Sequence, residues 1–208
     1  MNDRHGRELH NAPLKNVYVA RTVETPQPKY GQFLERAARL VRYSIGNIAV
    51  IRTAASTHIT YLETKGVKNK FRQEGFSGSD VRAFRADLEQ HIKSSGNLSA
   101  TYARTVKIDR AQPLVWKGVS KNKIALNVVA DDSLLSERAT IEEFLENRFG
   151  SVPAMRSFDP HITIGEAHTA ALSWDQRRDP IRLISRDVQF PKEIALNGLM
   201  AFLGRIDH

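Results

Sequence analysis

The chain has 208 residues, a formal net charge of +8 and no cysteine. The absence of cysteine excludes disulfide bonds, thiolate nucleophiles and cysteine-ligated metals. No run approaches the roughly 20 apolar residues that span a bilayer, and the first residues lack the apolar segment of a signal peptide. We therefore expect a cytoplasmic protein that does not enter a membrane.

The charge is unevenly distributed along the chain. Residues 1–75 contain 13 Lys and Arg against 6 Asp and Glu, whereas residues 76–208 contain 18 against 17. This asymmetry predicts an anionic partner that is bound mainly by the first half, and nucleic acid is the polyanion it fits best. The alternative is that the basic side chains only keep the surface soluble.

In chain order, the first half opens with a polar stretch, residues 1–13, that predicts a flexible tail. Runs of β-branched and aromatic residues then predict strands, and apolar residues at spacings of three and four predict helices. Strands are expected over residues 14–23, 48–52 and 57–62, and helices over residues 30–44 and 77–96. Arg36, Arg39 and Arg42 fall on the outer side of the first helix. Residues 65–72 are expected to form a basic, glycine-containing loop.

The second half repeats the order strand, helix, strand. Strands are expected over residues 99–108, 114–116, 124–130, 159–164, 182–190 and 194–203, with a helix over residues 131–149. This recurrence indicates an internal repeat. The predicted fold class is α+β, with two pseudo-symmetric, mostly antiparallel sheets, helices on their outer sides and a central active-site cleft. Residues 14–208 are expected to form this single bilobal domain.

One short motif occurs twice, 103 residues apart: His58-Ile59-Thr60 and His161-Ile162-Thr163. Random placement of the 7 His and 11 Thr gives roughly 0.4 His-x-Thr matches in a chain of this composition. Both copies lie in strand-like runs, where residues two apart point the same way. Each copy therefore presents an imidazole and a hydroxyl on one face of a strand. The alternative is that both are core strands whose histidines face inward.

Two imidazoles that face one cleft suit general acid–base catalysis. An unperturbed histidine has a pKa near 6.5, so one ring can accept a proton while the other donates one. Thr60 and Thr163 could hydrogen-bond the non-bridging oxygens of a phosphate between the rings. The sequence does not decide the order of the roles, and our working assignment makes His161 the base and His58 the acid.

Further substrate contacts are expected beside the two motifs. Lys65, Lys68 and Phe71 of the basic segment combine charge with an aromatic ring, as RNA sites do. Gly165 is expected to share the face of His161 and Thr163, where a missing side chain would let a substrate approach closely.

The paired motifs resemble the His-hydrophobic-Thr/Ser signatures of the 2H phosphoesterase superfamily. Within it, the chain is most similar to the bacterial 2′,5′ RNA ligase and RNA 2′,3′-cyclic phosphodiesterase group. The residues that carry the resemblance are His58-Ile59-Thr60, the run Asp159-Pro160-His161-Ile162-Thr163-Ile164 and the run Leu114-Val115-Trp116-Lys117-Gly118-Val119.

The resemblance implies a bilobal fold and a mechanism that needs neither metal nor cofactor. It implies that the partner is RNA, or a nucleotide with a 2′,3′-cyclic or 2′,5′ phosphate. It gives catalytic roles to His58 and His161 and phosphate-binding roles to Thr60 and Thr163. Thr57 stands where that group commonly has proline. The substrate within the superfamily, and whether hydrolysis or ligation is the natural direction, therefore stay open.

Two other functions are consistent with the same residues. The first is a non-catalytic, basic RNA-binding module. The second is a zinc hydrolase in which His58, His161 and Asp159 bind the metal, although the spacing typical of zinc-binding histidines is absent. In either case, as for the phosphodiesterase, we expect a monomer.

Overall fold

An antiparallel sheet of eight strands organises the fold in the computed structural model, which describes residues 17–62, 65–95, 102–117, 122–152, 158–168 and 172–203. The strands are β1 (Val17–Val23), β2 (Ala49–Ile51), β3 (His58–Leu62), β4 (Arg104–Lys107), β5 (Leu114–Lys117), β6 (Lys123–Asn127), β7 (His161–Ala167) and β8 (Glu193–Leu203). The helices are α1 (Pro28–Ile45), α2 (Lys65–Gln73), α3 (Gly78–Ser94), α4 (Asp132–Phe149) and α5 (Trp174–Asp187), with short 3-10 turns η1 (Gly46–Ile48) and η2 (Ala54–Ser56).

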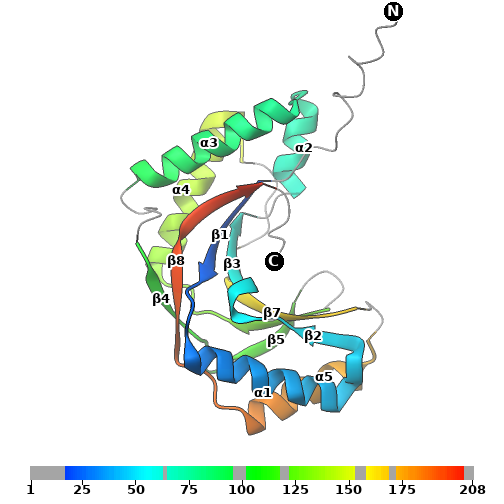
Figure 1. Ribbon diagram of the computed structural model, residues 1–208. Helices are drawn as coiled ribbons and strands as arrows, with labels where there is room; N and C mark the ends of the chain where they lie inside the picture. The colour runs from blue at the N-terminus through cyan, green and yellow to red at the C-terminus, as the bar shows by residue number, and fades with distance from the viewer. Residues whose placement is uncertain are drawn as a thin grey trace, which may run out of the picture.

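The strand order divides the sheet into two lobes. Neighbouring strands run β4-β8-β1-β3-β7-β6-β5. The short strand β2 pairs with the end of β7, beyond the point where β3 pairs with it. Strands β4, β8, β1 and β3 form the first lobe, which α2, α3 and α4 cover (Figure 1). Strands β7, β6, β5 and β2 form the second lobe, which α1 and α5 cover (Figure 1). The sheet curls so that all of these helices lie on its outer side.

Local signals in the sequence set the ends of the helices. The hydroxyl of Ser77 accepts a hydrogen bond from the backbone N–H of Asp80, whose carboxylate accepts one from Ser77 N–H in return. Asp131 caps α4 by accepting from the backbone N–H of Leu134. At the other end of α4, Gly150 has φ of 66°, in the left-handed region that glycine adopts without strain.

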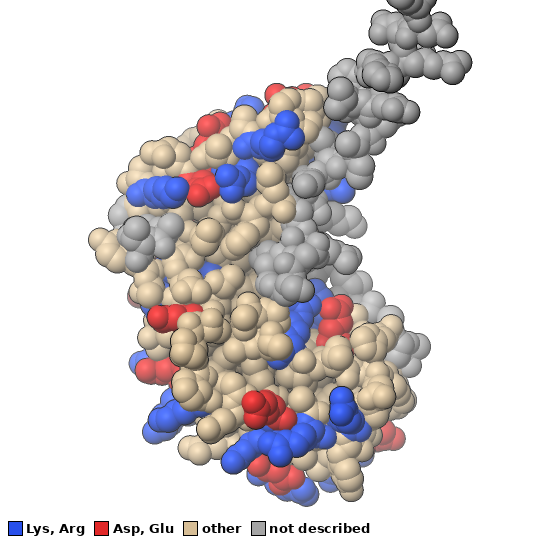
Figure 2. Space-filling model, in the orientation of Figure 1, with Lys and Arg blue, Asp and Glu red and all other residues tan. Residues whose placement is uncertain are grey.

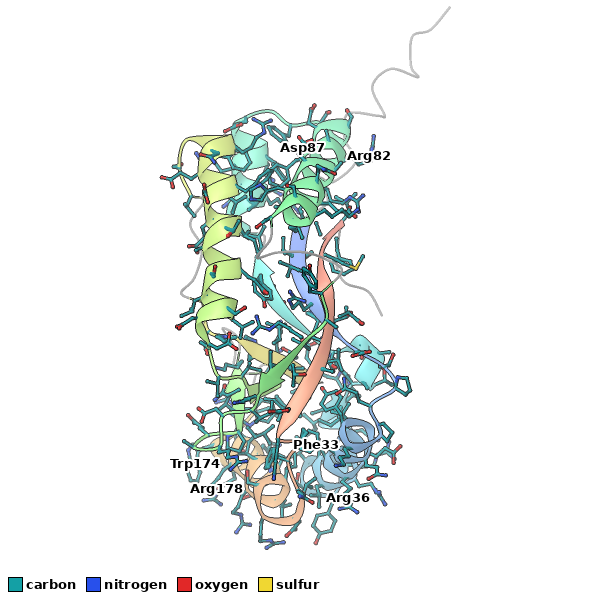
Figure 3. The ribbon with its side chains drawn as sticks, turned by 90° about the vertical axis from the view of Figure 1, so that its left-hand side faces the viewer. Phe33, Arg36, Arg82, Asp87, Trp174 and Arg178 are labelled. Atoms are coloured by element: carbon teal, nitrogen blue, oxygen red, sulfur yellow. The ribbon has the colours of Figure 1, made fainter. Side chains whose placement is uncertain are left out.

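The core lies between the outer face of the sheet and the helices. In the first lobe, Leu88 of α3 and Leu145 of α4 are fully buried with Ile194 and Leu196 of β8. In the second lobe, Phe33 of α1 points inward, with its ring 5.3 Å from that of Phe190, whereas Arg36 points outward (Figure 3).

The α+β class and the mostly antiparallel pairing are confirmed. The two predicted sheets are joined into one, because β3 pairs with β7 at the boundary between the lobes. Most predicted strands and the three predicted helices appear within a few residues of their expected ends. Residues 1–13, the expected tail, lie outside the described residues. No helix in the described part of the chain is long and apolar enough to cross a membrane.

Two element predictions were wrong. The expected loop over residues 65–72 is the helix α2, because Val67 and Phe71 lie four residues apart and both are buried in the core. The expected strand over residues 182–190 is mostly the end of α5. There Ile184 and Val188 share the buried side at helical spacing, and a capping box at Ser173 begins the helix.

Candidate active site

The two His-Ile-Thr motifs lie on neighbouring strands and meet at their central residues. Ile59 of β3 is the antiparallel partner of Ile162 of β7. Continued by one residue in each direction, this register sets His58 opposite Thr163 and His161 opposite Thr60. Residues directly opposite have Cβ atoms about 4.5–5.5 Å apart, and diagonal neighbours such as the two histidines about 7–8 Å. The fold thus brings together four side chains from segments about a hundred residues apart.

The four polar side chains point away from the core. Ile59 and Ile162 have no exposed surface and pack under the helices. His58, Thr60, His161 and Thr163 alternate with them and are half-buried, so they lie on the concave side of the curled sheet.

The internal repeat extends to the hydrogen-bond register. In each lobe the motif threonine pairs with an alanine, the next residue is skipped as a β-bulge, and pairing resumes one residue later. The pairs are Ala20 with Thr60 and Val19 with Leu62 in the first lobe, and Ala125 with Thr163 and Ile124 with Gly165 in the second. The skipped residues are Tyr61 and Ile164. The residue opposite each threonine is thus a small alanine, Ala20 or Ala125, and both alanines are fully buried.

The imidazole of His161 has a defined tautomer. Its Nδ1 lies 2.8 Å from the carbonyl oxygen of Asp159, and because a carbonyl can only accept, Nδ1 carries a proton and donates it. In the neutral ring Nε2 is then the free proton acceptor. Burial lowers the pKa of His161, and the positive charges of Lys117 and Lys123 lower it further, against the opposing effect of the Asp159 contacts. His161 is therefore set to be neutral near pH 7, as a general base must be.

Lys117 is a site residue that the motif search did not single out. Its Nζ forms an ion pair with the carboxylate of Asp159, 2.5 Å away, beside the imidazole of His161. The signal available in the sequence was a single charged residue in the apolar run Leu114-Val115-Trp116.

We expect Lys117→Gln to shift the acidic limb of the pH profile of kcat/KM to higher pH. His161 must lose its proton to act, and its pKa is lowered. In the native protein we therefore expect kcat/KM to decline only at a pH below the ordinary histidine pKa of about 6.5. Glutamine removes the nearby cation and leaves the Asp159 carboxylate unneutralised, and both changes favour the imidazolium. Lys117→Arg keeps the charge and should leave the limb in place. An unchanged limb in Lys117→Gln would show that this charge does not tune the base.

Each histidine also has a polar residue opposite it on the adjacent strand. Thr22 of β1 pairs with His58, and Asn127 of β6 pairs with His161. Asn197 donates a hydrogen bond to the hydroxyl of Thr22 at 2.9 Å. Asn127 donates its Nδ2 proton to the backbone carbonyl of residue 112 at 2.8 Å, and its buried Oδ1 accepts no hydrogen bond within the described part of the chain. Sequence alone gives no strand register, so these neighbours were not predictable from it.

Gly165 does not face the site as expected. The bulge at Ile164 turns it to the face of Ile124, which is buried under the helices. A Cβ atom placed there would lie 2.7 Å from Cδ1 of Ile51 and 2.8 Å from the carbonyl oxygen of Val50. The glycine therefore admits the neighbouring strand β2 and not a substrate.

Gly165→Ala is consequently expected to destabilise the protein by about 1–3 kcal/mol, because a backbone carbonyl cannot move aside as a side-chain tip can. Chemical denaturation would measure the loss. Gly31→Ala is the matched control: it lies inside α1 with nothing within 4 Å of its Cβ position. That substitution should be neutral or stabilising, since alanine favours helix. Equal stability of both variants would contradict the packing described for Gly165.

The basic segment after the first motif contributes less than predicted. Phe71 is fully buried, 5.0 Å from the rings of Phe76 and Phe84, so it cannot stack on a base. Lys68 is partly exposed on α2, and its contact with a substrate stays a prediction. The side chain of Lys65 lies outside what the structure describes.

A separate group of charges lies on the outer side of the first lobe. Arg21 of β1 donates from Nε and Nη2 to the carboxylate of Glu137 on α4, at 3.2 and 2.9 Å. Arg104 donates to the same carboxylate at 3.2 Å and to Asp131 at 2.8 Å. The guanidinium charges are balanced by carboxylates, so this is a structural cluster and not an anion site.

Asp159, one of the residues proposed for a zinc site, already has other partners. Its carboxylate forms an ion pair with Lys117, and its backbone carbonyl accepts a hydrogen bond from His161. The described residues contain no group of three or more His, Asp or Glu arranged to hold a metal ion.

Comparisons with known proteins bear on the fold. No family model matches this chain, and no curated protein matches its sequence. A solved structure of Usb1 from Kluyveromyces marxianus is similar to it, with a TM-score of 0.53, 11% identity, and coverage of 91% of this chain and 95% of that one. A structure of the same protein with uridine monophosphate gives a TM-score of 0.55, 13% identity and the same coverage, 91% and 95%. Over most of its length, this chain is therefore similar in fold to Usb1.

Proposed function

We propose that this protein is a metal-independent RNA phosphodiesterase that acts on 2′,3′-cyclic phosphates or 2′,5′ bonds by two-histidine acid–base catalysis. The observation that carries the proposal is the pairing of Ile59 with Ile162, which places an imidazole and a hydroxyl from each strand around one point on the concave face.

For a 2′,3′-cyclic phosphate, the proposed reaction is hydrolysis. Nε2 of neutral His161 takes a proton from water as the water oxygen forms a bond to phosphorus. The bond from phosphorus to one ribose oxygen breaks, and protonated His58 gives its proton to that oxygen. Each proton transfer would contribute about 10²–10⁴-fold. The tautomer and the lowered pKa of His161 support its role as the base.

Thr60 and Thr163 would hold the phosphate between the rings. Each hydroxyl can donate to a non-bridging oxygen, which gains negative charge in the transition state. Lys117 and Lys123 near His161 add positive potential. The site would thus stabilise an anionic phosphate without a bound ion.

The comparisons support a nucleotide as the ligand. A neighbour in fold was solved with uridine monophosphate, which shares a ribose and a phosphate with the proposed substrates. The net charge of +8 also favours an anionic substrate.

The test is turnover of a nucleoside 2′,3′-cyclic monophosphate and of a 2′,5′-linked dinucleotide, each with EDTA present. We expect hydrolysis of at least one, unaffected by the chelator. Loss of activity with EDTA would favour a zinc hydrolase. RNA binding without turnover of any phosphodiester would reduce the protein to a binding module.

A further inference from the structure

The outer face of α1 carries a row of basic side chains that the proposed active site does not use. The buried side of this helix is apolar, with Phe33, Leu34 and Val41 in the core. Its exposed cations are Lys29, Arg36, Arg39 and Arg42. At a rise of 1.5 Å per residue the row is about 20 Å long. Figure 2 shows Lys and Arg side chains at the lower edge of the molecule, where α1 lies, with acidic side chains among them.

These cations differ from those of the adjacent helix α5. There Arg178 pairs with Asp175 at 3.0 Å and stacks 4.3 Å from the centre of the Trp174 ring (Figure 3). Arg182 lies 3.9 Å from Asp179, and Arg186 lies 2.6 Å from Asp187.

Among the described residues, the exposed cations of α1 form no such ion pairs. None of its four exposed cations lies within 4.0 Å of a carboxylate oxygen among the described residues, and Glu35 is the one acidic residue on the helix. Neighbouring like charges on a helix repel each other. A ligand that is itself a chain of negative charges would relieve this repulsion along the whole row.

An aromatic residue stands at one end of the row. Tyr43 follows Arg39 by four residues and is 83% exposed. Residues four apart lie on the same side of a helix, so Tyr43 and Arg39 are neighbours on the surface of α1. A base can stack on such a ring while phosphates contact the cations, which is the combination that single-stranded RNA sites use. An anionic membrane fits less well, since the rest of the exposed face is polar.

We propose that the outer face of α1 (Lys29, Arg36, Arg39, Arg42 and Tyr43) is a second RNA-binding surface, which holds the phosphate backbone of a strand beyond the scissile phosphate. It depends on the proposed function only in taking RNA as the substrate. It lies on the opposite side of the second lobe's sheet from His161 and Thr163, because Ile162 and Ile164 of the same strand face the helix layer.

The test compares two double variants, Arg36→Gln/Arg39→Gln on α1 and Arg182→Gln/Arg186→Gln on α5. Each removes two exposed arginines from the outer face of the same lobe. Binding of a single-stranded 20-nucleotide RNA would be measured by fluorescence anisotropy over a range of salt. We expect the α1 variant to bind about tenfold more weakly, with a log Kd against log salt slope lower by about 1.4, and the α5 variant to bind like wild type.

Two further measurements complete the test. Turnover of a cyclic mononucleotide, which cannot reach α1 from the concave face, should be equal in all three proteins. Equal weakening in both double variants, or none in the α1 variant, would overturn the proposal. So would binding to phosphatidylserine vesicles in place of RNA. Because RNA binding is measured apart from turnover, an inactive protein that still shows the α1 effect would refute only the proposed reaction.

Discussion

Replacing either His58 or His161 by alanine is expected to lower kcat on a cyclic phosphate substrate by about 10²–10⁴-fold. Each ring supplies one of the two proton transfers, and the register of β3 and β7 offers no other titratable side chain at the same two points. The substrate should bind almost as well, because Thr60 and Thr163 remain to contact the phosphate. Steady-state kinetics with a nucleoside 2′,3′-cyclic monophosphate would measure the loss.

The double variant His58→Ala/His161→Ala should be little slower than the slower single variant, because acid and base act in one concerted step. His168→Ala is the matched control. His168 lies at the far end of β7, where its backbone N–H donates to the carbonyl oxygen of Ile48. Its loss should leave kcat unchanged. The assignment would be refuted if kcat fell by less than tenfold in either single motif variant, or if it fell equally in His168→Ala.

Glu137→Gln is expected to cost about 3–5 kcal/mol of unfolding free energy. Glu137 is the carboxylate that balances Arg21, and their side chains are only 4% and 2% exposed. Glutamine keeps a similar shape but leaves a buried guanidinium without its counter-ion. For a chain of about 200 residues this corresponds to a fall in Tm of roughly 6–20 °C.

Glu143→Gln on the same helix provides the comparison, since it removes the same charge from an exposed position. It should change the unfolding free energy by less than about 0.5 kcal/mol. Equal melting temperatures for the two variants would show that the Arg21–Glu137 pair is not a stabilising contact of the fold. Scanning calorimetry or denaturant melts would separate the two results.

The repeated motif was readable from sequence because it joins two independent signals. Alternation over Ile59 and Ile162 gave the strand and the buried face, and the residue types gave the chemistry. Helix ends were equally visible where capping was local, as at Ser77 and Gly150. These features depend on residues within a few positions of each other in the chain, so they could be predicted from the sequence.

Features that depend on distant strands were not readable. The face of Gly165 was predicted wrongly because a bulge at Ile164 changes the alternation, and a bulge is defined by the partner strand. Asn127 and Thr22 were missed because only the register of β6 and β1 sets them opposite the histidines. Phe71 looked like an exposed aromatic among lysines, but α2 turns it into the core.

Each half of the chain contributes one helix to the lobe that is built mainly from the strands of the other half. Helix α1, from the first half, covers the second lobe beside α5, and α4, from the second half, covers the first lobe beside α3 (Figure 1). If the backbone were cut between β4 and β5, each half would lose one of the helices that cover its strands. Two such fragments should each be insoluble alone yet reconstitute a working protein when produced together.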